Sequence, residues 1–317
     1  MRILYGVCCG LDVHKKEITA ALMTGEEEYV VKTFGTTTSA LCEMVSWLKT
    51  AGCEYVAMES TGVYWKPVYN IFEMEGIGAM VVNASHMKAI PGRKTDVNDA
   101  QWIADLLRHG LLRASFIPEK DQREYRELVR YRTARTEERA REINRLQKVL
   151  EGMNIKLGDF VSDVTGKSAS KLLDLALKTD ELTDEQIAEA SHGNLKASLD
   201  ELKESLSGII TPLQRELVAI ELDVIAEQSK QIAKVELLIR KYTKDAYEEA
   251  AKKLEAVPGI GKKSAQAIIA EIGIDMSRFP TANHLCAWAG VIPGNNESAG
   301  KRKNAKSRKG NKHLKKR

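Results

Sequence analysis

Four acidic residues in the first hundred positions stand where a sheet and a helix could bring them together. Asp12 lies inside the apolar strand pattern "CCGLDVH", and Glu59 ends a second one, "YVAMES". Asp96 and Asp99 follow in "KTDVNDAQWIADLL", at the predicted start of a helix, where their spacing lets both lean toward one point. Converging carboxylates repel each other unless a cation joins them. Mg²⁺ (or Mn²⁺) accepts such oxygen ligands together with substrate phosphates.

Asp12, Asp96 and Asp99 also have local explanations. Asp12 could form a salt bridge with Lys15 or Lys16, since an unpaired buried carboxylate is costly. Asp96 or Thr95 could cap the helix, and an acid in the first turn favours the helix dipole by about 0.3 to 1 kcal/mol. Only the four acids taken together, on a strand, a strand end and a helix start, predict a metal site. A metal bound there would polarise a phosphodiester. Without convergence of all four acids, the local explanations stand.

The elements that would position these acids alternate along residues 1–115. Three consecutive strands are predicted at 3–14, 17–23 and 27–34, and a helix at 38–52 with Thr38 or Ser39 as its cap. Strand and helix patterns then alternate as far as the helix that holds Asp99. This order predicts an α/β fold, a mixed sheet of RNase H-like type covered by helices. Ligands gather at the carboxyl ends of parallel strands in such sheets.

The middle of the chain, residues 116–250, is predicted to be a helical arm. Glu119–Glu151 is 33 residues long without Pro or Gly and dense in Arg and Glu, which indicates one long helix. A broken apolar stripe predicts a helical-hairpin or coiled-coil partner. Its members are Leu128, Tyr131, Ile143, Leu146, Val149 and Leu150. Residues 152–182 are interpreted as a connector. Thr183 and Gln186 form a predicted capping box, and helical patterning extends from about 195 to 242.

A third region, residues 251–317, opens with "VPGIGKKSAQAII" and is predicted to be mainly α-helical. A turn at Gly259 and Gly261 would expose backbone N–H groups at a helix start, and Lys262 and Lys263 add positive charge. This pattern is typical of a helix-hairpin-helix, which grips a nucleic-acid backbone without reading sequence. The alternative is a plain helical corner with solvated lysines.

Ser298 lies in the Gly/Asn-rich stretch "PGNNESAGKRK", interpreted as a loop, beside Lys301, Arg302 and Lys303. A serine becomes a nucleophile only when it is activated or its leaving group is preoriented, and no histidine stands nearby in the sequence. Serines are common in loops, so local chemistry alone gives Ser298 little weight.

Charge and composition favour some classes of protein and exclude others. Residues 301–317 hold ten Lys and Arg and no acid, while the whole chain of 317 residues carries only +4. This basic patch points to a polyanionic partner, although a solubilising tail is the alternative. The five cysteines form no CxxC pair, so neither a zinc ribbon nor a disulfide framework is predicted. With no signal sequence and no long apolar run, we expect a cytoplasmic protein without a membrane partner.

Six blocks together resemble a known family. They are "GLDVHKK", "MESTGVYW", "KTDVNDAQWIADLL", "VPGIGKKSAQAIIAEIG", "FPTANHLCAWAGVIP" and "ESAGKRKNAKSRKGNKHL". In this order they resemble the DEDD transposases of the IS-one-ten family of bacterial insertion sequences. The resemblance covers both ends of the chain, and the helical middle fits in character.

The resemblance implies a RuvC-like domain in which Asp12, Glu59, Asp96 and Asp99 bind Mg²⁺, a coiled-coil dimerisation arm, and a C-terminal transposase domain with Ser298 as nucleophile. In the family the serine is thought to form a covalent phosphoserine link to DNA, assisted by the acids across a protomer boundary. That arrangement implies a homodimer or homotetramer acting at the bacterial nucleoid. A structured noncoding RNA would pair with donor and target DNA. Members continue past the last block, so we expect a shortened C-terminal domain here.

Two other functions remain open. A RuvC-like, structure-selective endonuclease would use metal-activated water and never become linked to DNA. An inactive nucleic-acid-binding remnant of a transposase would bind in a salt-sensitive way without cleaving.

Overall fold

A computed structural model of the chain forms two compact units, residues 1–117 and 118–317, and each is described by itself. The structure describes residues 3–25, 28–60, 62–83, 87, 99–179, 182–191, 196–293, 296–298, 301–304, 307 and 310–315. A further division of the second unit at residue 250 stays a prediction.

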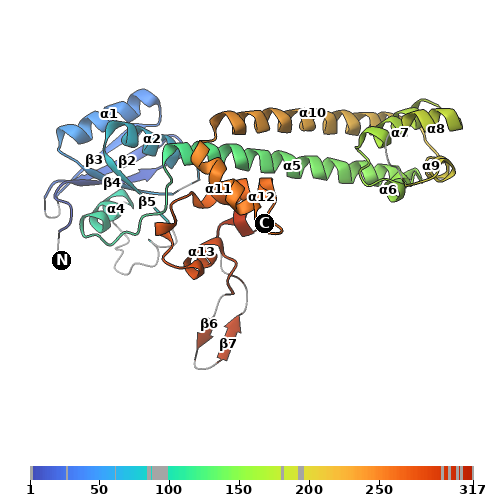
Figure 1. Cartoon of the computed structure of the whole chain (residues 1–317). Helices are drawn as coiled ribbons and strands as arrows, with labels where there is room; N and C mark the ends of the chain where they lie inside the picture. Colours follow the sequence, from blue (N-terminus) through green and yellow to red (C-terminus); the bar gives the residue numbers. More distant parts are fainter. Residues whose placement is uncertain are drawn as a thin grey trace. The chain divides into compact units, whose positions relative to one another are not determined.

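The first unit is built on a five-stranded mixed sheet (Figure 1). Its strands are β1 (Cys8–Val13), β2 (Glu17–Met23), β3 (Tyr29–Gly35), β4 (Tyr55–Glu59) and β5 (Gly78–Val82). They lie in the order β3-β2-β1-β4-β5, with β2 antiparallel to both β1 and β3, and with β1, β4 and β5 parallel. The mixed sheet is confirmed, and its order and directions agree with the predicted RNase H-like fold.

Helices cover both faces of this sheet. Leu11, Val56 and Met58 pack on one face against α1 (Thr38–Thr50) and α2 (Trp65–Glu75). Cys8 and Ala57 pack on the other face against α4 (Asp99–Arg108). The cap of α1 was predicted one residue or more too late: Thr37, with an extended backbone, accepts the hydrogen bond from the Ala40 N–H at 3.4 Å.

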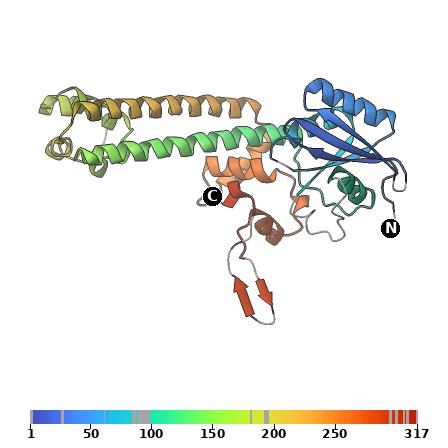
Figure 2. The same cartoon turned by 180° about the vertical axis from the view of Figure 1, so that it is seen from behind.

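Two long helices dominate the second unit, α5 (Lys120–Gly152) and α10 (Pro212–Tyr242), which lie along each other (Figures 1 and 2). The long helix and its helical partner are therefore confirmed. The predicted stripe on α5 is wrong at Tyr131, which is 47% exposed and lies against the Arg135 guanidinium. Tyr125, Val129 and Arg132 are buried on that part of α5 instead, because α11 and α12 as well as α10 pack there.

The far end of this helix pair is a small helical core. It contains α6 (Leu157–Phe160), α7 (Lys167–Lys178), α8 (Asp184–Ala190) and α9 (Leu199–Ser205). The interpretation of 152–182 as a connector is wrong, because Leu157, Leu172 and Leu173 pack with Leu146 and Leu150. The capping box of Thr183 and Gln186 is confirmed. The helix predicted from 195 to 242 is interrupted before Pro212, where Thr211 caps α10.

At the other end of the pair, α11 (Asp245–Glu255) and α12 (Lys262–Ile272) pack against α5 and α10 around Tyr125, Ile239 and Ala265. A 3-10 turn (Met276–Arg278), α13 (Ala282–Ala289), the hairpin strands β6 (Asn296–Ser298) and β7 (Lys301–Asn304), and α14 (Lys312–Lys315) follow. Within the described ranges, none of the helices combines the length and apolarity that a membrane crossing requires.

Candidate functional site: an acidic sheet edge and a pinned serine hairpin

The carboxyl ends of β1 and β4 bring Asp12 and Glu59 to one edge of the sheet. The parallel register pairs Gly10 with Ala57 and Leu11 with Met58. One step further along the same register, Asp12 lies beside Glu59, the last residue of β4. Because alternate residues share a face, both project from the face that α4 covers. Two of the four predicted ligands are therefore neighbours.

Helix α4 rests directly on β1 at Gly10. A Cβ atom at that position would lie 2.0 Å from the Ala100 carbonyl oxygen and 2.4 Å from the Ala104 amide nitrogen. Cys8, two residues earlier in β1, lies 3.6 Å from the Ala104 oxygen through its Sγ atom. The N-terminus of α4 thus points toward the carboxyl end of β1, which places Asp99, the first residue of the helix, at the end of the sheet that holds Asp12.

The side chain of Asp12 is 27% exposed and its Oδ2 lies 3.0 Å from Nε2 of His14. The salt bridge predicted with Lys15 or Lys16 is wrong, because His14 projects from the same side of the chain two residues on. Asp96 and Thr95 lie outside the described residues, so the fourth ligand and the predicted cap have no structural account. Among described side chains, no group of three or more His, Cys, Asp or Glu is arranged to hold a metal ion.

Gly10→Ala should disturb this edge without touching an acid. The added methyl group would collide with backbone atoms of α4, so the helix must move away from the sheet. We expect a loss of stability of about 1 to 3 kcal/mol, measured by urea unfolding, and a fall in strand exchange. Gly6→Ala is the matched control, because a Cβ there meets no atom within 4 Å. Equal stability of the two variants would contradict the close packing of α4.

Thiol chemistry at the amino ends of β1 and β4 is suppressed. Burial raises the pKa of Cys8 to about 11 and that of Cys53 to about 12. Burial also raises the pKa of Cys9 well above its ordinary value. These thiols stay protonated near neutral pH and pack as apolar groups.

In the second unit, a short turn joins α11 and α12 and carries the residues predicted to bind a nucleic-acid backbone. Gly259 has a φ of 89°, which favours glycine, and Gly261 is the N-cap of α12. A Cβ at either glycine would meet no atom within 4 Å, so the turn is open on its outer side. Lys262 is exposed, and Lys263 lies 4.0 Å from Glu236 on α10. The DNA-binding role of these four residues stays a prediction.

Ser298 ends strand β6 of a two-stranded hairpin, so its interpretation as a loop residue is wrong. Its backbone pairs with Lys301, and Glu297 pairs with Arg302. Lys301, Arg302 and Lys303 thus belong to β7, the strand that follows the serine. Both segments adopt extended backbone and pair antiparallel. Their catalytic and binding roles stay predictions.

Contacts at the base of this hairpin pin the chain on both sides. Pro293 bridges to Ser307. A Cβ at Gly310 would lie 2.3 Å from the backbone nitrogen of Gly290, so the two glycine backbones touch. The backbone N–H of Asn311 donates to the Trp288 carbonyl oxygen at 3.1 Å. The segment that carries Ser298 therefore leaves from and returns to the end of α13.

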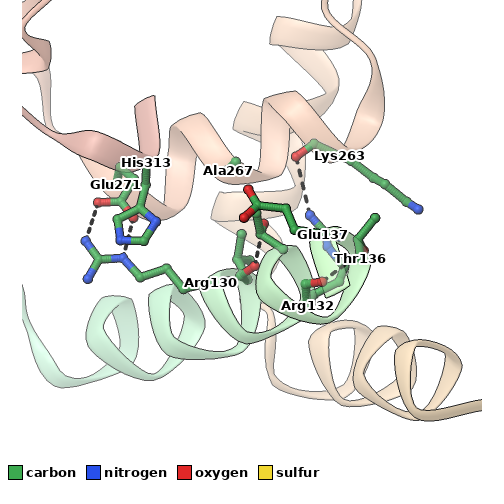
Figure 3. Close-up of a pocket in the computed structure, with 10 residues that line it drawn as sticks. Arg130, Arg132, Thr136, Glu137, Lys263, Ala267, Glu271 and His313 are labelled. Atoms are coloured by element: carbon green, nitrogen blue, oxygen red, sulfur yellow. Dashed lines mark hydrogen bonds and ion pairs between the residues drawn. The ribbon is translucent and has the colours of Figure 1, made fainter. Parts of the chain in front are cut away.

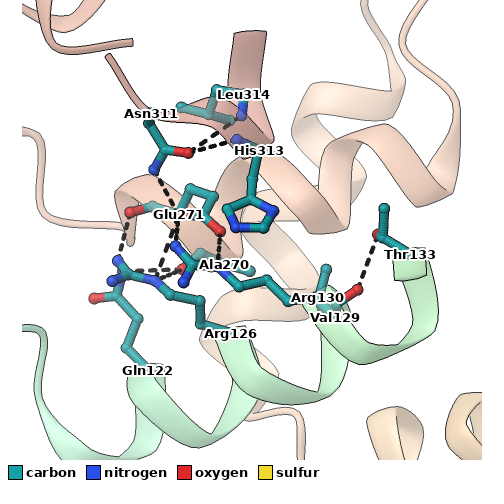
Figure 4. Close-up of polar contacts among 10 residues, drawn as sticks. All are labelled: Gln122, Arg126, Val129, Arg130, Thr133, Ala270, Glu271, Asn311, His313 and Leu314. Carbon is teal, nitrogen blue, oxygen red and sulfur yellow. Dashed lines mark hydrogen bonds and ion pairs between the residues drawn. The ribbon is translucent and has the colours of Figure 1, made fainter. Parts of the chain in front are cut away.

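A buried carboxylate ties this base to the long helix α5 (Figure 4). Glu271 on α12 is 2% exposed and accepts hydrogen bonds from Arg130 Nε at 2.6 Å and from Arg130 Nη2 at 2.7 Å. Asn311 Nδ2 donates to the same carboxylate at 2.6 Å, and Arg126 Nε lies 3.7 Å away. Burial alone would raise the pKa of Glu271, but these donors and arginine charges outweigh it and hold the pKa below its usual value.

Next to this cluster is a pocket of about 160 Å³ between α5 and α12 (Figure 3). Arg132, which is 1% exposed, donates to the Lys263 carbonyl oxygen at 3.3 Å and lies 3.5 Å from Glu236. Arg130 is already held by Glu271. The guanidinium groups of the pocket are thus already bound by carboxylates of the protein. The pocket is part of the contact that holds α12 on α5.

Sequence reasoning missed this cluster. Its one local signal is an acid in the apolar helix "SAQAIIAEIG", where Glu271 would need a partner to be buried. The partners come from Arg126 and Arg130 on α5 and from Asn311, far away in sequence. No local pattern identifies them.

Comparisons with known proteins agree on one class. A family model described as "Transposase" matches residues 9–155, which include the acidic sheet edge. A second, described as "Transposase IS116/IS110/IS902 family", matches residues 251–317, which include the α11–α12 turn and the serine hairpin. The protein is thus a transposase, an enzyme that catalyses DNA strand transfer. The chain belongs to the IS116/IS110/IS902 family of transposases.

Among solved structures, one similar chain is RuvC of T. thermophilus in complex with a Holliday junction substrate. The match has 12% identity, covers 35% of this chain and 100% of that one, and has a TM-score of 0.27. A score this low adds nothing to the fold assignment, which rests on the strand order. No curated protein matches the chain.

Proposed function

We propose that this transposase breaks and rejoins DNA through a covalent link to Ser298, assisted by Mg²⁺ held at the acidic sheet edge. The observation that carries the proposal is the placement of Asp12, Glu59 and Asp99 at one end of the sheet by the β1–β4 register and by the contact of α4 with Gly10. The three acids lie on three different elements at this end of the sheet, and a cation bound between them would offset their mutual repulsion.

The donor set fits a hard divalent cation. Carboxylate oxygens on two strands and a helix start suit Mg²⁺, which needs few protein ligands and takes phosphate oxygens for the rest. Asp12, Glu59 and Asp99, with Asp96, would hold it, and when bound it supplies charge stabilisation of the phosphodiester under attack. His14, hydrogen-bonded to Asp12, orients that carboxylate.

The serine step is a phosphoryl transfer. The Ser298 Oγ loses its proton and bonds to phosphorus, while one oxygen of the DNA backbone leaves as a hydroxyl. Rejoining reverses the exchange: a DNA hydroxyl attacks the phosphoserine and the serine leaves with a proton. A hairpin pinned at Gly310 and Asn311 supports this role, since it limits where the serine can travel.

Nucleic acid is held through its backbone in this proposal. The N-terminus of α12 with Gly259, Gly261, Lys262 and Lys263 would grip phosphates in the manner of a helix-hairpin-helix. Lys301, Arg302 and Lys303, beside Ser298 in the hairpin, would add charge close to the reacting strand. A structured noncoding RNA from the element would supply sequence recognition by base pairing, as the family resemblance implies.

The acids and Ser298 belong to different units, and the family resemblance implies catalysis across a protomer boundary. The proposal therefore includes a homodimer or homotetramer, with the helix pair α5 and α10 as a coiled-coil arm.

Ser298→Ala tests the nucleophile. With donor DNA, target DNA and the element's flanking RNA present, the wild-type protein should give a DNA-linked band in a denaturing gel, and the variant none. Ser307→Ala, a serine in the same segment, is the control and should keep the band. If the protein–DNA adduct persists in Ser298→Ala, Ser298 is not the nucleophile.

A RuvC-like structure-selective endonuclease is the second candidate, favoured by the acidic edge taken alone. It would release free DNA ends, and no protein-linked species would form. An inactive nucleic-acid-binding remnant would show neither product under any metal condition.

A further inference from the structure

Two exposed lysines lie at the carboxyl end of β1, just past its acid. Lys15 and Lys16 form the turn between β1 and β2. The N–H of His14 donates to the Glu17 carbonyl oxygen across this turn at 3.0 Å, and the Thr36 hydroxyl donates to the Lys15 carbonyl oxygen at 3.2 Å. The backbone of both lysines is therefore held at the end of the sheet that carries the acids.

These lysines carry charge that the protein itself does not use. Neither forms an ion pair with any acid that the structure describes, and the nearest acid in the sequence, Asp12, contacts His14 instead. Carboxylates at a sheet edge would repel a nucleic-acid backbone, and two cations at the same end offset that repulsion. The turn thus suits phosphate groups close to the acidic edge.

On the other side of the acids, the loop that follows Glu59 exposes two large apolar side chains. Val63 is 61% exposed and Tyr64 is 39% exposed. Gly62, with a φ of 54°, lies against the tyrosine ring: a Cβ at this glycine would be 3.7 Å from the ring Cε2 and 3.8 Å from Cδ2. Tyr64 is the N-cap of α2, but its side chain makes no capping hydrogen bond. The ring therefore rests on the loop while part of its surface stays open.

Tyr64 also differs from other aromatic side chains of the first unit. Tyr55, which is 40% exposed, lies at the amino end of β4 and packs against the Tyr5 ring with centroids 4.5 Å apart. Trp65 packs edge-on against Tyr69 at 5.9 Å. Tyr64 has no ring partner among the residues that the structure describes. At an edge that binds a phosphodiester, the ring available to it is a nucleobase.

We propose that this end of the sheet holds an unpaired segment of the reacting DNA strand, with a base resting on Tyr64 and Val63 and neighbouring phosphates held by Lys15 and Lys16. The segment is unpaired because the bases of a duplex are covered by their neighbours, and an aromatic side chain stacks only on an open face. All four are positioning residues, since they hold the strand and do not touch the bond that breaks. The inference rests on the proposed function and deepens it by naming the form of DNA that the acidic edge accepts.

The first test measures binding by the full chain. The probes are an oligothymidylate of about 20 nucleotides, long enough to span such a site, and the same strand in a duplex. Ca²⁺ replaces Mg²⁺, and fluorescence anisotropy gives the affinity. Tyr64→Ala should bind the single strand about 5-fold or more weakly, while Tyr64→Phe should bind like wild type, because stacking needs the ring and not the hydroxyl. Affinity for the duplex should change by less than about 2-fold in both variants.

The lysines are tested through the salt dependence of single-strand binding. Lys15→Ala/Lys16→Ala should reduce the slope of log K against log salt by about 1.4, the value for two lost phosphate contacts. Lys15→Arg/Lys16→Arg should keep the slope, because the charges remain. Lys230→Ala/Lys234→Ala removes two exposed lysines from α10 and is the matched control with an unchanged slope.

Photocrosslinking locates the base. An oligothymidylate carrying one 5-iododeoxyuridine should crosslink to Tyr64 on irradiation, as read by mass spectrometry of the digested protein. Met74→Ala, which truncates an 82% exposed side chain at the far end of α2, should alter neither crosslink nor affinity.

The proposal is wrong if Tyr64→Ala binds the single strand like wild type, if it loses duplex affinity equally, or if crosslinks form only elsewhere. A dependence on Tyr64 seen with single-stranded RNA and absent with DNA would also overturn it. These measurements need no strand transfer. A protein that passes them and yet forms no adduct at Ser298 would therefore count against the proposed function and leave the strand-binding surface in place.

Discussion

Asp12→Asn is expected to reduce strand exchange by at least about 1,000-fold, equivalent to roughly 4 kcal/mol of transition-state stabilisation. The amide has nearly the shape of the carboxylate but no charge, so it binds Mg²⁺ weakly while the strand keeps its packing. Leu11 and Val13, on the opposite face, remain in the core. Binding of DNA and RNA should survive, because the residues proposed to hold them lie in the other unit.

Exchange assays and calorimetric titration with Mg²⁺ measure this effect together. Asp99→Asn should behave like Asp12→Asn, since both acids lie at the same end of the sheet. Asp105→Asn is the matched control: it removes an acid from the same helix, but this acid is paired with His109 at 3.2 Å, one turn on. Full exchange by Asp12→Asn, or an equal loss in Asp105→Asn, would overturn the metal assignment.

The faces of the strands could be predicted because alternation leaves little choice. In "CCGLDVH" the apolar Leu11 and Val13 must face a core, so Asp12 must share the other face with Gly10. The need for glycine at position 10 could not be predicted. It arises from the backbone of Ala100 and Ala104, some ninety residues later. A close approach between distant segments leaves no local pattern.

The long helix α5 could be predicted within one residue at each end, because a run without Gly or Pro has few other options. The interpretation of residues 152–182 as a connector is wrong because this segment, unlike α5, contains several glycines. Gly152, Gly158 and Gly166 interrupt the pattern and suggest a linker. Leu157 and Leu172 nevertheless find a tertiary core with Leu146, which overrides local propensity.

Glu271→Ala is expected to destabilise the second unit by about 3 to 5 kcal/mol. The substitution leaves Arg130, whose Nε and Nη2 atoms both donate to this carboxylate, and the adjacent Arg126 without their buried counter-charge. Burial lowers the pKa of Arg126 to about 10, so it is still charged at neutral pH. Urea unfolding followed by circular dichroism measures the loss, and Glu249→Gln, an exposed acid on α11, should change stability by less than about 0.5 kcal/mol.

The same carboxylate gives the second unit an acid-labile contribution. The pKa of Glu271 is lower in the folded protein than in the unfolded chain, so its contribution is complete above the unfolded value, about 4.3. It is lost as the pH falls through the lower, folded value. Wild-type stability should therefore decline on acidification below about pH 4.3 more steeply than that of Glu271→Gln. Parallel pH profiles would show that the cluster of Arg126, Arg130 and Asn311 does not hold an ionised carboxylate. In that case the base of the serine hairpin would depend on its backbone contacts, those of Pro293 with Ser307, Gly290 with Gly310 and Trp288 with Asn311.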